Sequence, residues 1–295
     1  MDPEKRLEAF EKMLAEVQKD YETAENNRKK FIILIFILGI VLFFRYENHH
    51  LVVSCCTYQN DKITAETDGY RIVQISDLHN AKFGQNNEKL IRKIASLEPD
   101  MIVVTGDLVD SNHTDLDVAI HFMESVTQIC PVYYVTGNHE YWLDEKDRIK
   151  LYTEMEKAGV FLLQNEAVTI SVSETSFSLI GLDDRSLSDG TLSSLMQDCD
   201  SDCLRVVLAH EPQYIEKYSQ TGVDLVFCGH AHGGQFILPF LGAVVAPDQG
   251  LFPKYTAGEY RMGNTTMYVS RGLGNSVIPI RLFNDPEIVC VELRG

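Results

Sequence analysis

The chain has 295 residues and a formal net charge of −17, from 26 basic and 43 acidic side chains. Hydrophobic residues make up 45% and charged residues 23% of the sequence, which is typical of a globular protein and too apolar for a disordered one. General nucleic-acid binding depends on basic side chains that neutralise phosphates, so this acidic composition argues against it. Seven scattered cysteines without a Cys-x-x-Cys pair argue against a zinc ribbon or a thioredoxin-type site.

Residues 1–30 have the pattern of a charged amphipathic helix. Apolar side chains recur there in steps of three and four, at Leu7, Phe10, Leu14, Val17, Tyr21 and Ala24. A solvated helix with one apolar stripe explains this pattern, and so does a short coil in which residues 5–24 associate weakly with a second copy.

An apolar run follows at residues 31–44, between Arg28, Lys29 and Lys30 on one side and Arg45 on the other. As a helix it spans roughly 21 Å, which is short for a hydrocarbon core of roughly 30 Å. A cleaved signal peptide fits less well because the preceding region is long and acidic, and a buried core helix rarely lacks a polar face. We therefore predict a single-pass transmembrane anchor in the cell membrane. The basic bias before the run predicts a cytoplasmic N-terminus and an extracytoplasmic main domain.

Residues 51–295 read as one α/β domain, in which short β-branched runs alternate with helical patterns. Val52–Cys55 is expected to form an edge strand. The other expected strands are Arg71–Ile75, Met101–Val104, Val132–Val135, Phe177–Ile180, Arg205–Leu208, Asp224–Phe227, Met267–Val269 and Ile288–Leu293. The expected helices are Glu88–Leu97, Leu116–Val126, Glu145–Ala158 and Tyr214–Ser219. This order predicts a mainly parallel sheet covered by helices.

Metal-binding residue types follow five of the expected strands. In open α/β sheets, ligands bind at the carboxyl ends of the strands. Each of these motifs alone is weak, but their conjunction at strand ends is hard to explain by packing. The motifs are Asp77-Leu78-His79, Gly106-Asp107-Leu108-Val109-Asp110, Gly137-Asn138-His139-Glu140, His210 and Gly229-His230-Ala231-His232.

Together these motifs resemble the signature of the calcineurin-like metallophosphoesterases, with no departure at any motif position. The resemblance extends from Tyr70 to the C-terminus and implies a four-layer α/β/β/α sandwich. The later segments Ser270–Gly274, Pro279–Arg281 and Pro286–Ile288 resemble a bacterial membrane-anchored branch of the family. That branch is often compared with UDP-2,3-diacylglucosamine pyrophosphohydrolases.

The resemblance implies two metal ions and assigns a ligand set to each. One ion would take Asp77, His79 and His232, the other Asn138, His210 and His230, and Asp107 would bridge them. Mixed carboxylate, imidazole and amide ligands suit divalent Mn, Fe, Zn or Mg. Two cations roughly 3.5–4 Å apart can hold a hydroxide between them as the nucleophile and clamp the oxygens of an in-line phosphoryl displacement.

The resemblance also implies a role for two residues beside the ligands. His139 would stabilise charge on the phosphate and help to protonate the leaving group, and Asp110 would orient its imidazole. For Asp110 alone, a turn or helix-capping role is an equal alternative. Asp183 and Asp184 are read as turn residues or as residues behind the ligands. Arg185, Arg271 and Arg281 could grip a phosphate, although each is individually more typical of a surface residue.

The sequence thus predicts a metal-dependent phosphoesterase acting on phosphomonoester, phosphodiester or pyrophosphate bonds, including a lipid-linked pyrophosphate. The alternative is a metal-binding scaffold of the same fold without catalysis. Retention of His139 and of every ligand position favours the enzyme.

Overall fold

The structure is a computed structural model that describes residues 3–184 and 190–295, with the side chains of the first helix at residue 8 and from residue 10 onward. The chain divides into two compact units, residues 1–46 and 47–295. The first unit consists of α1 (Pro3–Glu47), which ends just inside the second. Residues 3–30 and 31–44, which belong to two different expected segments, therefore form one uninterrupted helix.

The expected self-association stripe lies on α1. The side chains of Phe10, Leu14, Val17 and Tyr21 are all exposed there, whereas the side chain of Leu7 lies outside the described residues. Weak association through residues 5–24 stays a prediction.

The prediction of a membrane anchor at residues 31–44 is wrong. Among the residues that the structure describes, no helix combines the length and the apolar character needed to cross a membrane. The apolar run covers only about 21 Å of α1, against a hydrocarbon core of about 30 Å. Lys30 and Arg45 bound it within the same helix. The predicted single-pass location in the cell membrane, with a cytoplasmic N-terminus and an extracytoplasmic domain, is overturned with the anchor.

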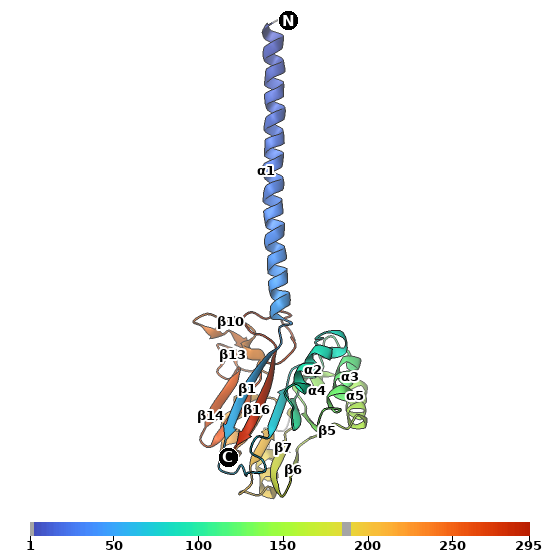
Figure 1. The fold of residues 1–295 in the computed structure, drawn as a ribbon, viewed down its shortest axis with the longest axis vertical. Coiled ribbons are helices and arrows are strands. Elements are labelled where there is room, and N and C mark those ends of the chain that lie inside the picture. The colour runs from blue at the N-terminus through green and yellow to red at the C-terminus, as the bar shows by residue number, and fades with distance from the viewer. Residues whose placement is uncertain (1–2, 185–189) are drawn as a thin grey trace. The chain divides into compact units, whose positions relative to one another are not determined.

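The second unit contains two six-stranded sheets (Figure 1). In the first, β2, β3, β4 and β5 are parallel, β16 is antiparallel to β2, and β1 is the edge strand, parallel to β16. The order across this sheet is β1 (Val52–Gln59), β16 (Glu287–Arg294), β2 (Arg71–Ile75), β3 (Met101–Thr105), β4 (Val132–Val135) and β5 (Phe161–Leu162).

The second sheet has a parallel centre and two antiparallel edges. Its order is β14 (Gly258–Met262), β15 (Thr265–Val269), β9 (Leu225–Cys228), β8 (Arg205–Leu208), β7 (Thr175–Gly181) and β6 (Glu166–Val172). The edge pairs β14–β15 and β6–β7 are antiparallel. Two hairpins lie between β9 and β14: β10 (Ile237–Leu238) with β11 (Gly242–Ala243), and β12 (Val245–Ala246) with β13 (Gly250–Leu251).

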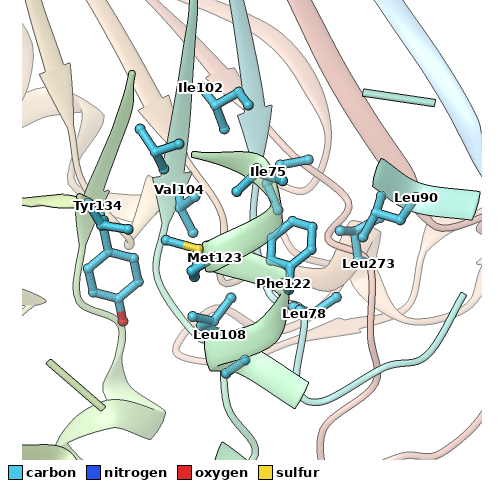
Figure 2. Close-up of a cluster of buried hydrophobic side chains, with 14 of the residues drawn as sticks. Ile75, Leu78, Leu90, Ile102, Val104, Leu108, Phe122, Met123, Tyr134 and Leu273 are labelled. Atoms are coloured by element: carbon cyan, nitrogen blue, oxygen red, sulfur yellow. The ribbon is translucent and has the colours of Figure 1, made fainter. Parts of the chain in front are cut away.

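Three hydrophobic cores hold the layers of this unit together. Strand β3 shows why, because successive side chains of a strand point to opposite faces. Ile102 and Val104 join the core beneath the helices, while Met101 and Val103 join a core shared by both sheets. Figure 2 shows Phe122 and Met123 of helix α3 beside Ile102 and Val104 in the first of these cores. The helices that accompany the first sheet are α2 (Glu88–Ala95), α3 (Leu116–Val126), α4 (Asn138–Trp142) and α5 (Glu145–Lys157).

The second sheet is covered on its other face by short helices. The third core joins Val207 and Val226 of that sheet to Leu192 and Ile215. These two residues belong to α6 (Thr191–Leu195) and α7 (Ile215–Gln220). The two sheets therefore pack face to face with helices outside them. The expectation of a mixed α/β fold with parallel-containing sheets is confirmed.

Candidate metal centre

The five predicted motifs meet at the carboxyl ends of strands from both sheets. The loops after β2, β3 and β4 come from the first sheet, and those after β8 and β9 from the second. A hydrogen bond from the backbone N–H of His230 to Asp77 Oδ1, 3.0 Å long, joins the two sheets at this edge. The predicted ligands are buried, with exposed fractions from 0% for Asp77 to 5% for His79 and His232; Asn138, which is half-buried, is the exception.

Among the described residues the potential ligand atoms form three groups: two share Asp107, and the third contains Glu211, His230 and Asp248 nearer the surface. The first group contains Asp77, His79, Asp107 and His232, and the second contains Asp107, His210 and His230. Within each group the atoms all lie within 4.8 Å of one another, close enough to surround one metal ion. Carboxylate Oδ2 of Asp107 lies 3.5 Å from Nε2 of His79 and 3.2 Å from Nε2 of His210. This one oxygen therefore stands between the two groups.

The backbone is left-handed at five of these side chains. The φ angles are 50° at Asp77, 43° at His79, 52° at Asp107, 65° at His230 and 47° at His232. Such a conformation costs an L-residue about 1–3 kcal/mol and persists only where the surroundings enforce it. These left-handed residues lie directly after β2, β3 and β9, where they turn each loop sharply so that the side chains face one another. Strain gathered in this way is characteristic of a functional site.

Glycine is required where two of these loops approach each other. A Cβ on Gly137 would lie 2.3 Å from Oδ1 of Asp107, and one on Gly229 would lie 1.9 Å from Oγ of Ser76. The loop after β4 is thus pressed against that after β3, and the loop after β9 against that after β2. A side chain at either glycine would push the sheets' ligand loops apart.

Hydrogen bonds fix which nitrogen of His210 faces the centre. Its Nδ1 lies 2.7 Å from the carbonyl oxygen of Thr105, which can only accept, so Nδ1 carries a hydrogen and donates it. Burial lowers the pKa of His210, but Asp107 outweighs burial and holds that pKa well above its usual value, so Nε2 near Asp107 also carries a hydrogen in the metal-free site. A metal ion would replace that hydrogen at the lone pair of Nε2. A bond of this kind on the outer nitrogen is usual for histidines that bind metals.

Burial and charge set the protonation of the metal-free site. Burial lowers the pKa of His79 and of His232 to about 3, so both rings are neutral and each keeps a lone pair for a metal. Burial alone would raise the pKa of Asp107, but His210 outweighs it and holds that pKa well below its usual value. The bridging position is therefore occupied by an ionised carboxylate.

Asn138 shows a buried acceptor that lacks a partner. Its Oδ1 is inaccessible to solvent and has no hydrogen-bond donor among the described residues. A buried acceptor without a donor lowers the stability of a protein by about 1–3 kcal/mol. The burial of Asn138 Oδ1 therefore agrees with its expected role as a metal ligand. The N–H of His139, the next residue, donates to Oδ1 of Asp107 at 2.8 Å, which places this segment beside the shared carboxylate.

His139 packs on the ligands without belonging to either group. Its ring centre lies 4.5 Å from that of His79 and 4.7 Å from that of Trp142. The backbone N–H of Ser111 donates to its Nδ1 at 3.1 Å. The hydrogen of the neutral ring is therefore on Nε2, which lies 3.0 Å from Oγ of Ser276. The expected catalytic side chain thus presents an N–H donor at the site.

Asp110 lies near His139, but not in direct hydrogen-bond contact. Its Oδ1 is 3.6 Å from Nδ1 of His139, whereas it accepts a 2.9 Å hydrogen bond from the N–H of Asn112. The adjacent Ser111 makes the direct contact with the ring. The carboxylate therefore stabilises the turn that carries Ser111 and acts on His139 electrostatically.

The expected phosphate-binding arginines are engaged elsewhere. Arg271 pairs with the Glu287 carboxylate at 3.0 Å. Arg281 is fully buried and donates to Oδ1 of Asn275 at 3.1 Å and to the carbonyl oxygens of Arg271 at 2.9 Å and Gly274 at 2.6 Å. Both therefore hold the segment 271–284 in place instead of facing a substrate. Arg185 lies outside the described residues.

Glu140, the last residue of the Gly137–Glu140 motif, has a structural role that the motif did not indicate. Its carboxylate accepts hydrogen bonds from the N–H groups of Asp107 at 3.0 Å, Leu108 at 2.8 Å and Gly137 at 2.8 Å. It is fully buried. Gly137 lies three residues before Glu140, but Asp107 and Leu108 lie 33 and 32 residues before it, so the motif alone does not indicate these contacts.

A two-sheet α/β fold with paired Asp/His groups at its strand ends is suited to metal-dependent hydrolysis. Comparison with known families agrees, because the calcineurin-like phosphoesterase model matches residues 70–234, more than half of the chain. The chain belongs to the calcineurin-like phosphoesterase family. It is a hydrolase acting on phosphoric esters, and its clustered Asp and His residues suit a dinuclear centre of divalent metal ions.

Three relatives show how far the similarity extends. The uncharacterized metallophosphoesterase YkuE of Bacillus subtilis is 32% identical over 262 residues, covering 85% of this chain and 88% of that protein. The uncharacterized metallophosphoesterase Cj0846 of Campylobacter jejuni is 30% identical over 268 residues, covering 90% and 70%. The phosphodiesterase YaeI of Escherichia coli is 29% identical over 234 residues, covering 76% and 82%.

Proposed function

We propose that this chain hydrolyses phosphoric esters with two divalent metal ions held at the shared carboxylate of Asp107. Asp77, His79 and His232 would hold the first ion, and Asn138, His210 and His230 would hold the second. The observation that carries the proposal is the position of Asp107 Oδ2, within 3.5 Å of His79 Nε2 and 3.2 Å of His210 Nε2. When bound, Mn, Fe, Zn or Mg ions supply positive charge and an activated water at the phosphoryl group.

The residues of the chain supply orientation and a proton donor. His139 Nε2–H is directed at the oxygen of Ser276, 3.0 Å away, and would donate in the same way to an ester oxygen of a bound substrate. Because Ser111 occupies Nδ1, the ring cannot turn its donor away without losing a hydrogen bond. His139 therefore stabilises and protonates the leaving-group oxygen, a contribution typical of a positioned general acid.

The substrate reaches the centre through a cavity of about 510 Å³ beside the first group. Its lining includes His79, Asp110 and Ser276 from the site, together with the apolar Val277 and with Lys82, whose ammonium pairs with Asp115 at 3.1 Å. Such a mixed lining accommodates an anionic group with an apolar neighbour. A phosphodiester is our first substrate class, supported by the name of the Escherichia coli relative.

A lipid-linked pyrophosphate of the UDP-2,3-diacylglucosamine type is the second substrate candidate. The observation favouring it is the apolar rim of the cavity, where the side chain of Val277 is 82% exposed. This finer assignment rests on the cavity lining and on the resemblance of the segments 270–274, 279–281 and 286–288.

A metal-reconstituted activity screen tests the proposal. Chelator-treated protein is loaded with Mn²⁺ and offered bis-p-nitrophenyl phosphate, p-nitrophenyl phosphate and a nucleoside diphosphate-lipid. We expect metal-dependent hydrolysis of at least one compound, abolished by chelator and restored by metal. Stable binding of two ions with no hydrolysis of any compound would instead favour the non-catalytic scaffold.

A further inference from the structure

The two ring nitrogens of His230 face opposite surroundings. Its Nδ1 lies 3.1 Å from Nε2 of His210, inside the second group. Its Nε2 lies 2.9 Å from Oδ2 of Asp248, outside that group. An ionised carboxylate can only accept, so Nε2 carries the hydrogen and Nδ1 keeps the lone pair. The lone pair is thus directed at the position of the second metal ion.

Asp248 lies in a turn that is fixed by hydrogen bonds. It lies between β12 and β13, with a left-handed φ of 53°, a conformation that Asp tolerates better than most residues. The next side chain, Gln249, both donates to the carbonyl of Tyr255 at 2.8 Å and accepts from its N–H at 2.9 Å. These paired bonds close the loop behind Asp248. The hydrogen bonds of Gln249 therefore fix the turn in which the side chain of Asp248 contacts His230.

The contact joins a buried ring to a surface carboxylate. The side chain of His230 is 4% exposed, whereas that of Asp248 is 64% exposed. Asp248 belongs to none of the five motifs and lies eighteen residues beyond His230 in the chain. Carboxylates that accept from the outer nitrogen of a metal-binding histidine fix its tautomer and ring orientation and raise its basicity.

We propose that Asp248 is a positioning residue for the second metal ion, acting through the Nε2–H of His230. This inference rests on the proposed function, in which His230 binds that ion through Nδ1. It makes the β12–β13 turn part of the metal site, since movement of the turn would release the ring. The affinity of one ion, but not of the other, depends on this turn.

The test is a Co²⁺ titration of the metal-free full-length chain, followed by visible absorption and by the amount of bound metal. Asp248→Gly removes the acceptor and suits the left-handed backbone, while Asp248→Asn keeps an acceptor without its charge. Glu216→Gln, an exposed acid on α7, is the matched control. Thermal unfolding of each metal-free variant checks that the fold is intact.

We expect Asp248→Gly to weaken one of the two binding steps by about 10–100-fold and to alter its Co²⁺ spectrum, leaving the other step unchanged. Asp248→Asn should lie between wild type and the glycine variant, His230→Ala should lose the same step, and Glu216→Gln should match wild type. Two ions bound to Asp248→Gly with wild-type affinity would overturn the inference alone. Fewer than one ion bound to wild type would overturn the proposed function as well.

Discussion

The backbone N–H of Asp107 donates a 3.0 Å hydrogen bond to the fully buried carboxylate of Glu140. The same carboxylate accepts from the N–H groups of Leu108 and Gly137, so it ties the loop after β3 to the loop after β4. In return, the N–H of His139 donates to the side chain of Asp107. The shared carboxylate and the expected catalytic histidine are thus set by one reciprocal network.

Glu140→Gln should destabilise the fold. An amide presents one hydrogen-bonding oxygen and turns N–H groups toward backbone donors, leaving buried N–H groups without acceptors. Each unmet donor costs about 1–3 kcal/mol, so the free energy of unfolding should fall by about 3 kcal/mol or more. Urea denaturation of the metal-free protein measures this, with the exposed Glu174→Gln as control. An unchanged midpoint would show that the network contributes little.

Asp107→Asn should lower metal content and activity together. The substitution removes a negative charge from between two cations while keeping the shape of the side chain. We expect fewer than two ions per chain after Mn²⁺ loading, measured by elemental analysis, and loss of hydrolysis in the same preparation. Retention of both ions would show that the Asp107 charge does not hold the centre together.

His139→Ala should separate catalysis from metal binding. The ring contacts His79 but belongs to neither ligand group, so the metal count should stay close to wild type. Turnover should fall by roughly 10²–10⁴-fold if the ring supplies general acid catalysis. The loss should be smaller for p-nitrophenolate, a leaving group that needs little protonation. Metal loss as severe as in Asp107→Asn would refute this division of roles.

Asp110→Asn should have a milder effect than His139→Ala. Its Oδ1 accepts from the Asn112 N–H, and an asparagine oxygen can do the same, so the turn that carries Ser111 is kept. The substitution removes the negative charge that lies 3.6 Å from Nδ1 of His139 and 3.5 Å from Nδ1 of His113. We expect kcat to fall with an unchanged metal count, and steady-state kinetics would check this. A loss equal to that of His139→Ala would assign Asp110 a direct part in proton transfer.

Much of the fold could be predicted because its central elements carry local patterns. Helix α3 and strands β2, β4 and β8 have the expected bounds. The helix has a clear apolar periodicity, and each strand is a short β-branched run between polar or turn-forming residues. Edge strand β6 was missed. Val168, Ile170 and Val172 alternate there with Thr169 and Ser171, as in a half-buried strand, and pack on the core between the sheets, so the signal for this strand is present in the sequence.

The site was predictable to the extent that its residues follow strands directly. The contacts between individual atoms of the site could not be predicted from the sequence. Glu140, Asp248 and Arg281 act through contacts with residues that are distant in the chain. Arg281 illustrates this best, since its motif is compatible with a phosphate-binding role while its side chain is fully buried against backbone carbonyls. The apolar run at 31–44 has the hydropathy and the basic flanks of a membrane span, but as a helix it covers only about 21 Å of a hydrocarbon core of about 30 Å.

Simultaneous measurement of bound Mn²⁺ and hydrolysis of bis-p-nitrophenyl phosphate tests the central claim most directly. Metal-free protein is titrated with Mn²⁺, and both quantities are followed in the same samples. The two ligand groups sharing Asp107 predict saturation at about two ions per chain, with hydrolysis rising as the second ion binds. Saturation at one ion or fewer, or hydrolysis that does not change with bound metal, would contradict the dinuclear phosphoesterase.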